Sequence, residues 1–217
     1  MIARKGLFIS VEGVDGSGKS TQARLLAQAL GARLTREPGG SPGAEEIRRL
    51  LVEGEASRWS PEAEILLFTA ARRDHLEKSI LPALDAGETV ICDRFADSTR
   101  VYQAARAGAH GAALREKVDL LHEAMIGIEP DLTFLIDADP ATALARGMAR
   151  SQALGSGEDR YESLGASFQR ALRAGFLALA TQFPGRVRVI DGNRSVDAIA
   201  ADLAALSRAA QGARAHG

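Results

Sequence analysis

The chain contains the octapeptide Gly13-Val14-Asp15-Gly16-Ser17-Gly18-Lys19-Ser20. It matches the phosphate-loop pattern G-x-x-x-x-G-K-[ST], between an apolar strand pattern and a helical one. Glycines let backbone N–H groups turn toward a phosphate, and the N-terminus of the following helix adds partial positive charge there. By chance such a match arises in roughly 1% of chains this long, so we predict a nucleotide phosphate site.

The end of the octapeptide predicts how a nucleoside triphosphate is held. Lys19 should bridge the β- and γ-phosphate oxygens, and the Ser20 hydroxyl should coordinate Mg²⁺. The predicted ATP-binding residues are Gly13, Val14, Asp15, Gly16, Ser17, Gly18, Lys19, Ser20 and Thr21.

Short β-rich runs alternate with long helical patterns along the chain. This alternation predicts an α/β fold with a central five-stranded parallel sheet flanked by helices. The expected strands are 6–11, 33–36, 88–92, 131–136 and 186–190, and the expected helices are 19–30, 44–53, 61–86, 111–126, 140–150, 163–183 and 195–210. A glycine-bearing break at 151–159 predicts a mobile lid. We therefore expect a single domain, residues 1–217, with a frayed tail from Gln211.

Composition limits the classes of partner. The 217 residues have a formal net charge of -1, so the protein's overall electrostatic field does not attract nucleic acid or anionic lipid. No run approaches the roughly 18 apolar residues of a membrane span. We expect a cytoplasmic protein without nucleic-acid or membrane partners. The single cysteine, Cys92, is expected to be a buried strand residue.

A second group of basic residues suggests a second phosphorylated ligand. Arg36 and Arg94 follow neighbouring predicted strands, so they should lie near one another. Arg72 on a helix could join them, whereas Arg48 alone would suit a solvated helix surface. A guanine-binding switch needs an Asn-Lys-x-Asp tetrapeptide, and the only asparagine, Asn193, is followed by Arg194. These features favour an enzyme with two nucleotide substrates.

Two aspartates end predicted strands and could hold the metal. We assign that role to Asp93, because Arg94 beside it supplies a cation for the acceptor phosphate. Asp137 leads into Asp139-Pro140, a helix start, and is expected to cap or hydrogen-bond in that turn.

Four stretches, the first of which includes the phosphate loop, resemble the thymidylate kinase family, and the match runs from the first strand to the last helix. They are Glu12-Gly13-x-Asp15-Gly16-x-Gly18-Lys19-Ser20-Thr21, Thr35-Arg36-Glu37-Pro38-Gly39-Gly40, Leu66-Leu67-Phe68-x-x-Ala71-Arg72 and Asp93-Arg94-Phe95-x-x-Ser98-Thr99-x-x-Tyr102-Gln103. The resemblance implies a P-loop nucleoside monophosphate kinase fold with a short lid, phosphorylation of dTMP to dTDP, ATP as donor, Mg²⁺ as cofactor and a homodimer. Another nucleoside monophosphate kinase or deoxynucleoside kinase of the same fold is the alternative, and a nonenzymatic nucleotide switch is a second one.

The resemblance also implies roles in acceptor binding. Phe68 would stack on thymine, Arg72 would meet the base or the phosphate, and Tyr102 would crowd a ribose 2′-hydroxyl. Asp15 would reach the sugar 3′-hydroxyl, and Thr99 and Gln103 would contact the pyrimidine edge. Two alternatives stay open: that Phe68 is an ordinary core residue, and that Thr99 and Gln103 are ordinary helix residues without contact to the base. The full implied dTMP set is Asp15, Arg36, Pro38, Arg48, Phe68, Arg72, Arg94, Ser98, Thr99, Tyr102 and Gln103.

Transition-state charge must come from outside the loop, because Gly16 stands where some family members have arginine. Arg146 and Arg150 are spaced i, i+4 before the glycine-bearing break and resemble arginines that bacterial members donate from a lid, with Arg160 assisting. The implied lid is residues 146–160, although an exposed helix surface is the plainer reading of its arginines. The expected catalytic residues are Lys19, Asp15, Arg94, Arg146 and Arg150.

Overall fold

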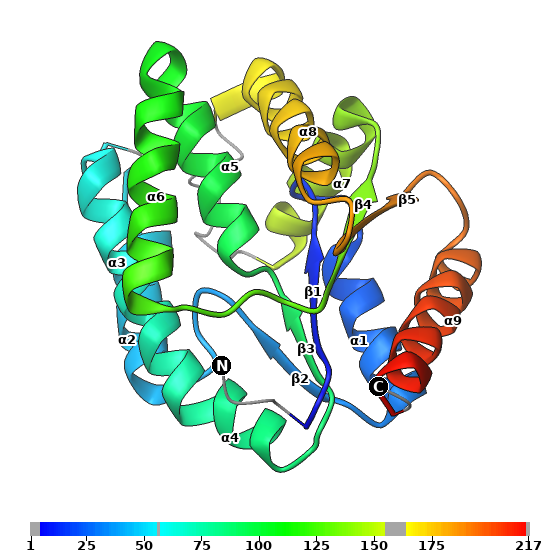
Figure 1. Ribbon diagram of the computed structural model, residues 1–217. Coiled ribbons are helices and arrows are strands. Elements are labelled where there is room, and N and C mark those ends of the chain that lie inside the picture. Colours follow the sequence, from blue (N-terminus) through cyan, green and yellow to red (C-terminus); the bar gives the residue numbers. More distant parts are fainter. Residues whose placement is uncertain (1–4, 56, 155–163, 216–217) are drawn as a thin grey trace.

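The computed structural model describes residues 5–55, 57–154 and 164–215. Its core is a five-stranded sheet in the order β2-β3-β1-β4-β5, with every neighbouring pair parallel (Figure 1). The strands are β1 (Phe8–Glu12), β2 (Arg33–Arg36), β3 (Val90–Asp93), β4 (Leu132–Asp137) and β5 (Val187–Asp191). The predicted α/β fold with five parallel strands is confirmed.

Four of the strands end one residue later than expected. Asp93, Asp137 and Asp191 are therefore the last residues of β3, β4 and β5, and Glu12 is the last residue of β1. Val11 is the register partner of Asp93, which places the ends of β1 and β3 together. Carboxylates consequently line the carboxyl edge of the sheet, the edge where ligands bind in open α/β folds.

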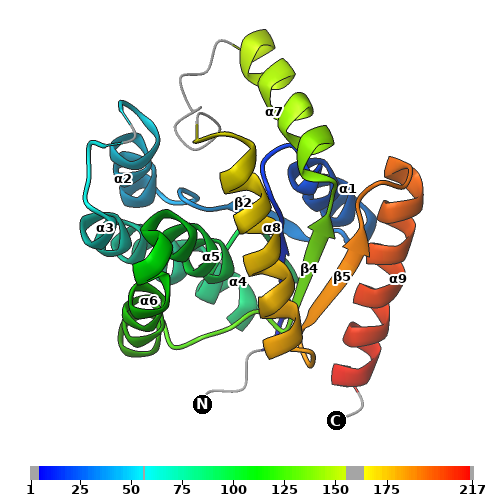
Figure 2. The ribbon, with the colours of Figure 1, turned by 90° about the horizontal axis from the view of Figure 1, so that it is seen from above.

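Helices cover both faces of the sheet. They are α1 (Lys19–Leu30), α2 (Pro42–Val52), α3 (Pro61–His75), α4 (Leu81–Asp85), α5 (Ala96–Ala107), α6 (Gly111–Met125), α7 (Pro140–Leu154), α8 (Gly165–Gln182) and α9 (Val196–Ala215), with a π-turn η1 (Leu76–Ile80) and a 3₁₀ turn η2 (Gly108–His110). Ile9 packs with α1 and α9, whereas Phe8 faces the opposite side and packs with α4. Figure 2 shows α1 and α9 on one side of the sheet and α5 and α8 on the other.

Helix α5 was not among the helices predicted from sequence. Its buried residues include Asp97, Thr99, Arg100 and Gln103. Hydrophobic periodicity identifies helices by an apolar buried face, and here that face is largely polar. The absence of an apolar pattern is therefore explained by a buried helix face that makes hydrogen bonds and ion pairs.

Other boundaries also differ from the prediction. The expected helix 61–86 is divided into α3, η1 and α4, and α7 continues through Leu154, so the break does not begin at Ser151. Helix α9 continues to Ala215, where Arg214 bonds the Gly6 carbonyl oxygen at 2.9 Å, so the tail is not frayed from Gln211. Residues 155–163 lie outside the described residues, and the lid across 146–160 stays a prediction.

Helix ends follow the capping signals. The Ser60 hydroxyl accepts a bond from the Ala63 N–H at 3.2 Å, directly before Pro61. Asp139, before Pro140, accepts from the Thr142 N–H at 2.9 Å.

Within the described residues, the helices are too short or too polar to span a bilayer.

Candidate active site

The phosphate loop lies between β1 and α1, as its sequence pattern predicted. Gly16 has φ +78° and Gly18 has φ +94°, a region that favours glycine. A Cβ atom on Gly16 would lie 1.8 Å from the Ala143 carbonyl oxygen and 2.9 Å from the Gly147 nitrogen. Helix α7 therefore packs directly against the loop and leaves no room for a side chain at position 16.

Lys19 is buried at the first position of α1 and is held by the loop itself. Its ammonium group lies 3.2 Å from Asp15 Oδ1 and 3.4 Å from the Val14 carbonyl oxygen. Burial and the nearby Arg94 lower the pKa of Lys19, and Asp15 opposes that effect. Ser20 follows at an exposed position and Thr21 at a half-buried one.

Arg94 occupies the turn between β3 and α5 with φ +72°, in the left-handed region. Non-glycine residues rarely adopt this conformation, and such strain is common at functional sites. The Arg94 guanidinium lies 2.5 Å from Asp15 Oδ1 and donates to Ser98 Oγ at 2.8 Å. It also lies over the Tyr102 ring, 5.0 Å from the centroid. The strained turn thus aims Arg94 across the sheet edge at the phosphate loop.

Asp15 joins the two cations of the site. One carboxylate oxygen contacts both Lys19 and Arg94, and the other accepts the Tyr102 hydroxyl at 2.8 Å. Burial acts to raise the pKa of Asp15, but the charges of Arg94 and Lys19 outweigh burial and hold that pKa below its ordinary value. An ionised carboxylate therefore stands between the phosphate-loop lysine and the arginine of the second cluster.

Glu12 is a buried residue of the site to which the sequence analysis assigned no role. It is fully buried and accepts the Phe95 N–H at 2.7 Å and the Ser98 hydroxyl at 2.6 Å, so a β1 carboxylate caps helix α5. Burial, then Asp97, raises the pKa of Glu12 to about 7. Two signals in the sequence could have found it: its position directly before Gly13 and its place as the first residue of the motif that contains the phosphate loop. Because Ser98 in turn accepts from Arg94, Glu12 links the phosphate loop to the arginine cluster.

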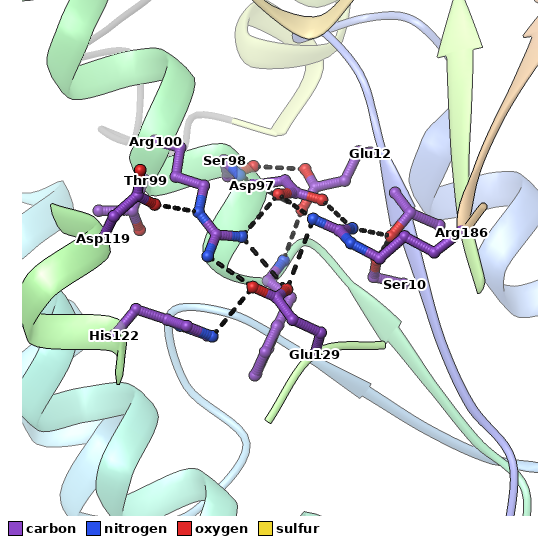
Figure 3. Close-up of polar contacts among 12 residues, drawn as sticks. Ser10, Glu12, Asp97, Ser98, Thr99, Arg100, Asp119, His122, Glu129 and Arg186 are labelled. Carbon is purple, nitrogen blue, oxygen red and sulfur yellow. Dashed lines mark hydrogen bonds and ion pairs between the residues drawn. The ribbon is translucent and has the colours of Figure 1, made fainter. Parts of the chain in front are cut away.

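Beneath Glu12 a larger ionic network fixes the start of α5 (Figure 3). Arg100 donates to Asp97 at 2.9 Å and to Glu129 at 2.5 Å. Arg186, at the beginning of the β5 segment, donates to Asp97 at 2.6 Å. Each buried charge has an oppositely charged partner, which is what burial of ionic groups requires. The network anchors the helix that supplies Ser98, Thr99, Tyr102 and Gln103.

Helices α3 and α5 face one another through polar side chains. Arg72 is 4% exposed, donates to Glu37 Oε2 at 2.7 Å and to Thr99 Oγ1 at 2.9 Å. One turn earlier on α3, Phe68 is half-buried and belongs to none of the described core clusters. Phe68 is therefore not part of the described core, and its stacking on a base stays a prediction.

The remaining predicted acceptor residues lie around β2 and α2. Arg36 on β2 is the register partner of Asp93 on β3. The backbones of Arg36 and Arg94 are therefore close in space, as expected. The Arg36 guanidinium is exposed and bonds Glu45 at 3.1 Å. Arg48 donates to the Pro38 carbonyl oxygen at 2.8 Å, which ties α2 to the loop after β2.

Asp93 fits the predicted role of metal ligand. Its Oδ1 atom is buried and has no hydrogen-bond partner within the described residues. A buried carboxylate oxygen left without a partner is suited to a hard cation, and the Ser20 hydroxyl at the start of α1 offers a second oxygen. The expectation for Asp137 was wrong: its carboxylate pairs with Arg173 of α8 at 2.6 and 2.8 Å, and Asp139 caps α7 instead.

The predicted lid arginines are described only in part. Arg146 is exposed on α7, next to Gly147, in the turn that contacts Gly16 of the phosphate loop. The side chain of Arg150, and Arg160 altogether, lie outside the described residues. Of this group, Arg146 is the one that the described structure brings near the loop.

A glycine-rich phosphate loop between β1 and α1, at the carboxyl edge of a five-stranded parallel sheet, is typical of P-loop phosphotransferases. The family model described as thymidylate kinase matches residues 11–203. Similar curated proteins include thymidylate kinases of Ruegeria pomeroyi, 60% identical over 91% of this chain and 92% of that protein, and of Dinoroseobacter shibae, 62% identical over 94% and 97%. The crystal structure of thymidylate kinase from Ehrlichia chaffeensis matches with a TM-score of 0.66 and 35% identity, covering 85% of this chain and 92% of that one. The chain belongs to the thymidylate kinase family.

Proposed function

We propose that this chain phosphorylates dTMP to dTDP with ATP as the donor. The observation that carries the proposal is the contact of Asp15 with both Lys19 and Arg94, at 3.2 and 2.5 Å. In this proposal Lys19 binds the donor phosphates and Arg94 binds the acceptor phosphate, and the shared contact with Asp15 Oδ1 supports a close approach of the two. Two phosphates bound by these cations would lie end to end.

The reaction needs alignment and charge neutralisation more than covalent chemistry. An oxygen of the acceptor phosphate attacks the γ-phosphorus, and the bond from that phosphorus to the β,γ-bridging oxygen breaks in line. Backbone N–H groups of the loop and Lys19 hold the donor, and Arg94 orients the acceptor. Arg146 or Arg150 would supply positive charge near the bridging oxygen.

We assign Mg²⁺ to Ser20 and Asp93. The unpartnered Asp93 Oδ1 atom supports this donor set. When bound, the ion neutralises charge on the phosphate oxygens. Carboxylate and hydroxyl oxygens are the hard ligands that Mg²⁺ prefers over softer ions.

We further propose a cytoplasmic homodimer without nucleic-acid partners. Exposed apolar side chains support the dimer: Leu66 on α3 is 58% exposed, and Leu120 and Met125 on α6 are 67% and 50% exposed. Helices α3 and α6 contact one another, and we propose that both contribute to the dimer interface. Sedimentation of the chain should give twice its monomer mass, and replacement of Leu120 by Glu should give the monomer.

A panel assay tests the proposed function. ADP formation from ATP should depend on added dTMP, with weaker turnover of dUMP and little turnover of thymidine, AMP or CMP. The alternative of another kinase of this fold predicts a different preferred acceptor. Slow ATP hydrolysis that no acceptor accelerates would instead favour a nucleotide switch.

A further inference from the structure

One amide at the α3–α5 contact is held in a single orientation. Gln103 is fully buried, and its Nε2 atom donates to Glu64 Oε2 at 2.9 Å. Its Oε1 atom is buried and has no hydrogen-bond partner within the described residues. An unpartnered buried oxygen costs free energy unless something else donates to it.

Glu64 determines which end of the amide is left over. An ionised carboxylate only accepts hydrogen bonds, so the NH₂ group of Gln103 must face it. Arg106 also donates to Glu64 Oε2, which keeps that oxygen an acceptor. Rotation of the Gln103 amide by half a turn would bring two acceptor oxygens together. The free end of Gln103 is therefore a fixed acceptor.

The Glu64–Gln103 pair joins the same two helices, α3 and α5, that carry the other base-contact candidates. On α3, Glu64, Phe68 and Arg72 follow one another at intervals of four residues. On α5, Thr99 and Gln103 have the same spacing, and the pairs Arg72–Thr99 and Glu64–Gln103 are hydrogen-bonded. Residues four apart share a helix face, so Phe68 lies between the two bonded pairs.

We propose that Glu64 is a positioning residue that fixes the Gln103 amide and thereby makes the acceptor site select a pyrimidine with an N–H at ring position 3. This inference rests on the proposed function. Thymine and uracil carry that hydrogen, which would bond the Gln103 Oε1 atom. Cytosine presents a lone pair at the same ring position, so two acceptors would face each other, an arrangement that is strongly disfavoured in a buried site.

Glu64→Gln tests the inference, because a glutamine at position 64 can present either N–H or C=O to Gln103. The amide of Gln103 can then turn and offer a donor to cytosine. We expect the kcat/KM ratio of dTMP to dCMP to fall by about tenfold, with the dTMP to dUMP ratio unchanged. Glu62→Gln is the matched control on the same helix: Glu62 pairs with Lys117 at 3.0 Å, both exposed, and the variant should retain both ratios.

A second measurement needs no variant. The 3-deaza analogue of dTMP, in which C–H replaces the ring N–H, should bind the unmodified chain about tenfold more weakly than dTMP in calorimetry. Equal binding of the two, or an unchanged dTMP to dCMP ratio in Glu64→Gln, would overturn the role of Glu64 and Gln103. If the unmodified chain showed no turnover of dTMP or dUMP, the proposed function itself would fail.

Discussion

The donor and acceptor ends of the site are built by different means. The donor end consists of consecutive residues of one loop, and glycine conformations such as that of Gly16, with φ +78°, set its shape. The acceptor end is assembled from side chains of separate elements, such as Arg94 after β3 and Arg72 on α3. One end is therefore determined by local chain geometry, and the other depends on how distant elements pack.

This difference explains why the two ends tolerate change differently. Backbone N–H groups cannot be removed by a side-chain substitution, so the donor end is most sensitive at its glycines. The arginines of the acceptor end have individual protein partners, as Arg72 has Glu37 and Arg36 has Glu45. Single substitutions at the acceptor end should therefore change binding of one ligand and leave the other.

The largest effect should come from the lid arginines, which belong to neither end. We predict that Arg150→Ala lowers kcat by about 10³-fold and changes dTMP affinity little, because its charge would act on the bridging oxygen in the transition state. Steady-state kinetics and calorimetry with dTMP measure the two quantities, and Arg146→Ala is the parallel variant. Loss of dTMP affinity with little loss of kcat would assign Arg150 to the acceptor end.

Gly16→Ala should be the most damaging change at the donor end. The new Cβ atom would overlap the Ala143 carbonyl oxygen, so we expect a loss of about 3 kcal/mol in the free energy of unfolding, measured in urea. Gly18→Ala is the matched control: it also has positive φ, but no atom lies within 4 Å of its added Cβ. Left-handed strain alone should cost about 1 kcal/mol there. Equal losses in the two variants would rule out contact with α7 as the cause.

Glu12, which connects the two ends, should make stability depend on pH. Its pKa is raised from 4.5 to about 7 by burial and Asp97, so ionising it in the folded chain costs about 3 kcal/mol. A raised carboxyl pKa means that this cost is absent below pH 4.5, grows between pH 4.5 and about 7, and is constant at higher pH. Relative to Glu12→Gln, the unmodified chain should lose stability over that window. Urea unfolding at several pH values measures the difference, and a pH-independent one would contradict the prediction.

Arg94→Ala tests the acceptor end. We expect dTMP binding to weaken by about 100-fold or more while ATP affinity is nearly retained, because a charge-assisted bond to phosphate is lost. Calorimetry with each ligand separately measures both. Arg33→Ala is the matched control. Arg33 also forms an ion pair, with Glu88 at 2.9 Å, but its side chain is exposed. Retained dTMP affinity would remove Arg94 from the site.

The contrast between the ends also sets what the sequence could predict. The phosphate loop, with Lys19 and Ser20, follows from consecutive residue types, and its placement between β1 and α1 is confirmed. The polar buried face of α5 concealed that helix from hydrophobic periodicity. The partners Glu12 and Glu64 were missed because they lie 86 and 39 residues from Ser98 and Gln103, and only the packed fold brings them together. The arginines of the acceptor end could be proposed from their places after neighbouring strands, whereas the contacts with the base and the sugar came from family resemblance.

The smallest expected effect is that of Tyr102→Phe, which removes the Tyr102 hydroxyl and keeps its ring. The hydroxyl donates to Asp15 at 2.8 Å, and the ring packs edge-on against Phe168 and Phe176 of α8. Tyr102→Phe should weaken dTMP binding by about tenfold or less, because the hydroxyl's bonds to Asp15 and from Arg94 are lost and the ring stays. Its preference for deoxyribose over ribose should persist, since a ring that excludes a 2′-hydroxyl acts by its volume. Tyr102→Ala should lower that preference, measured as the kcat/KM ratio of dTMP to the ribonucleotide. If Tyr102→Phe lost the preference as well, the hydroxyl rather than the ring would exclude ribose, and acceptor selection would depend on the Asp15 contact that both ends share.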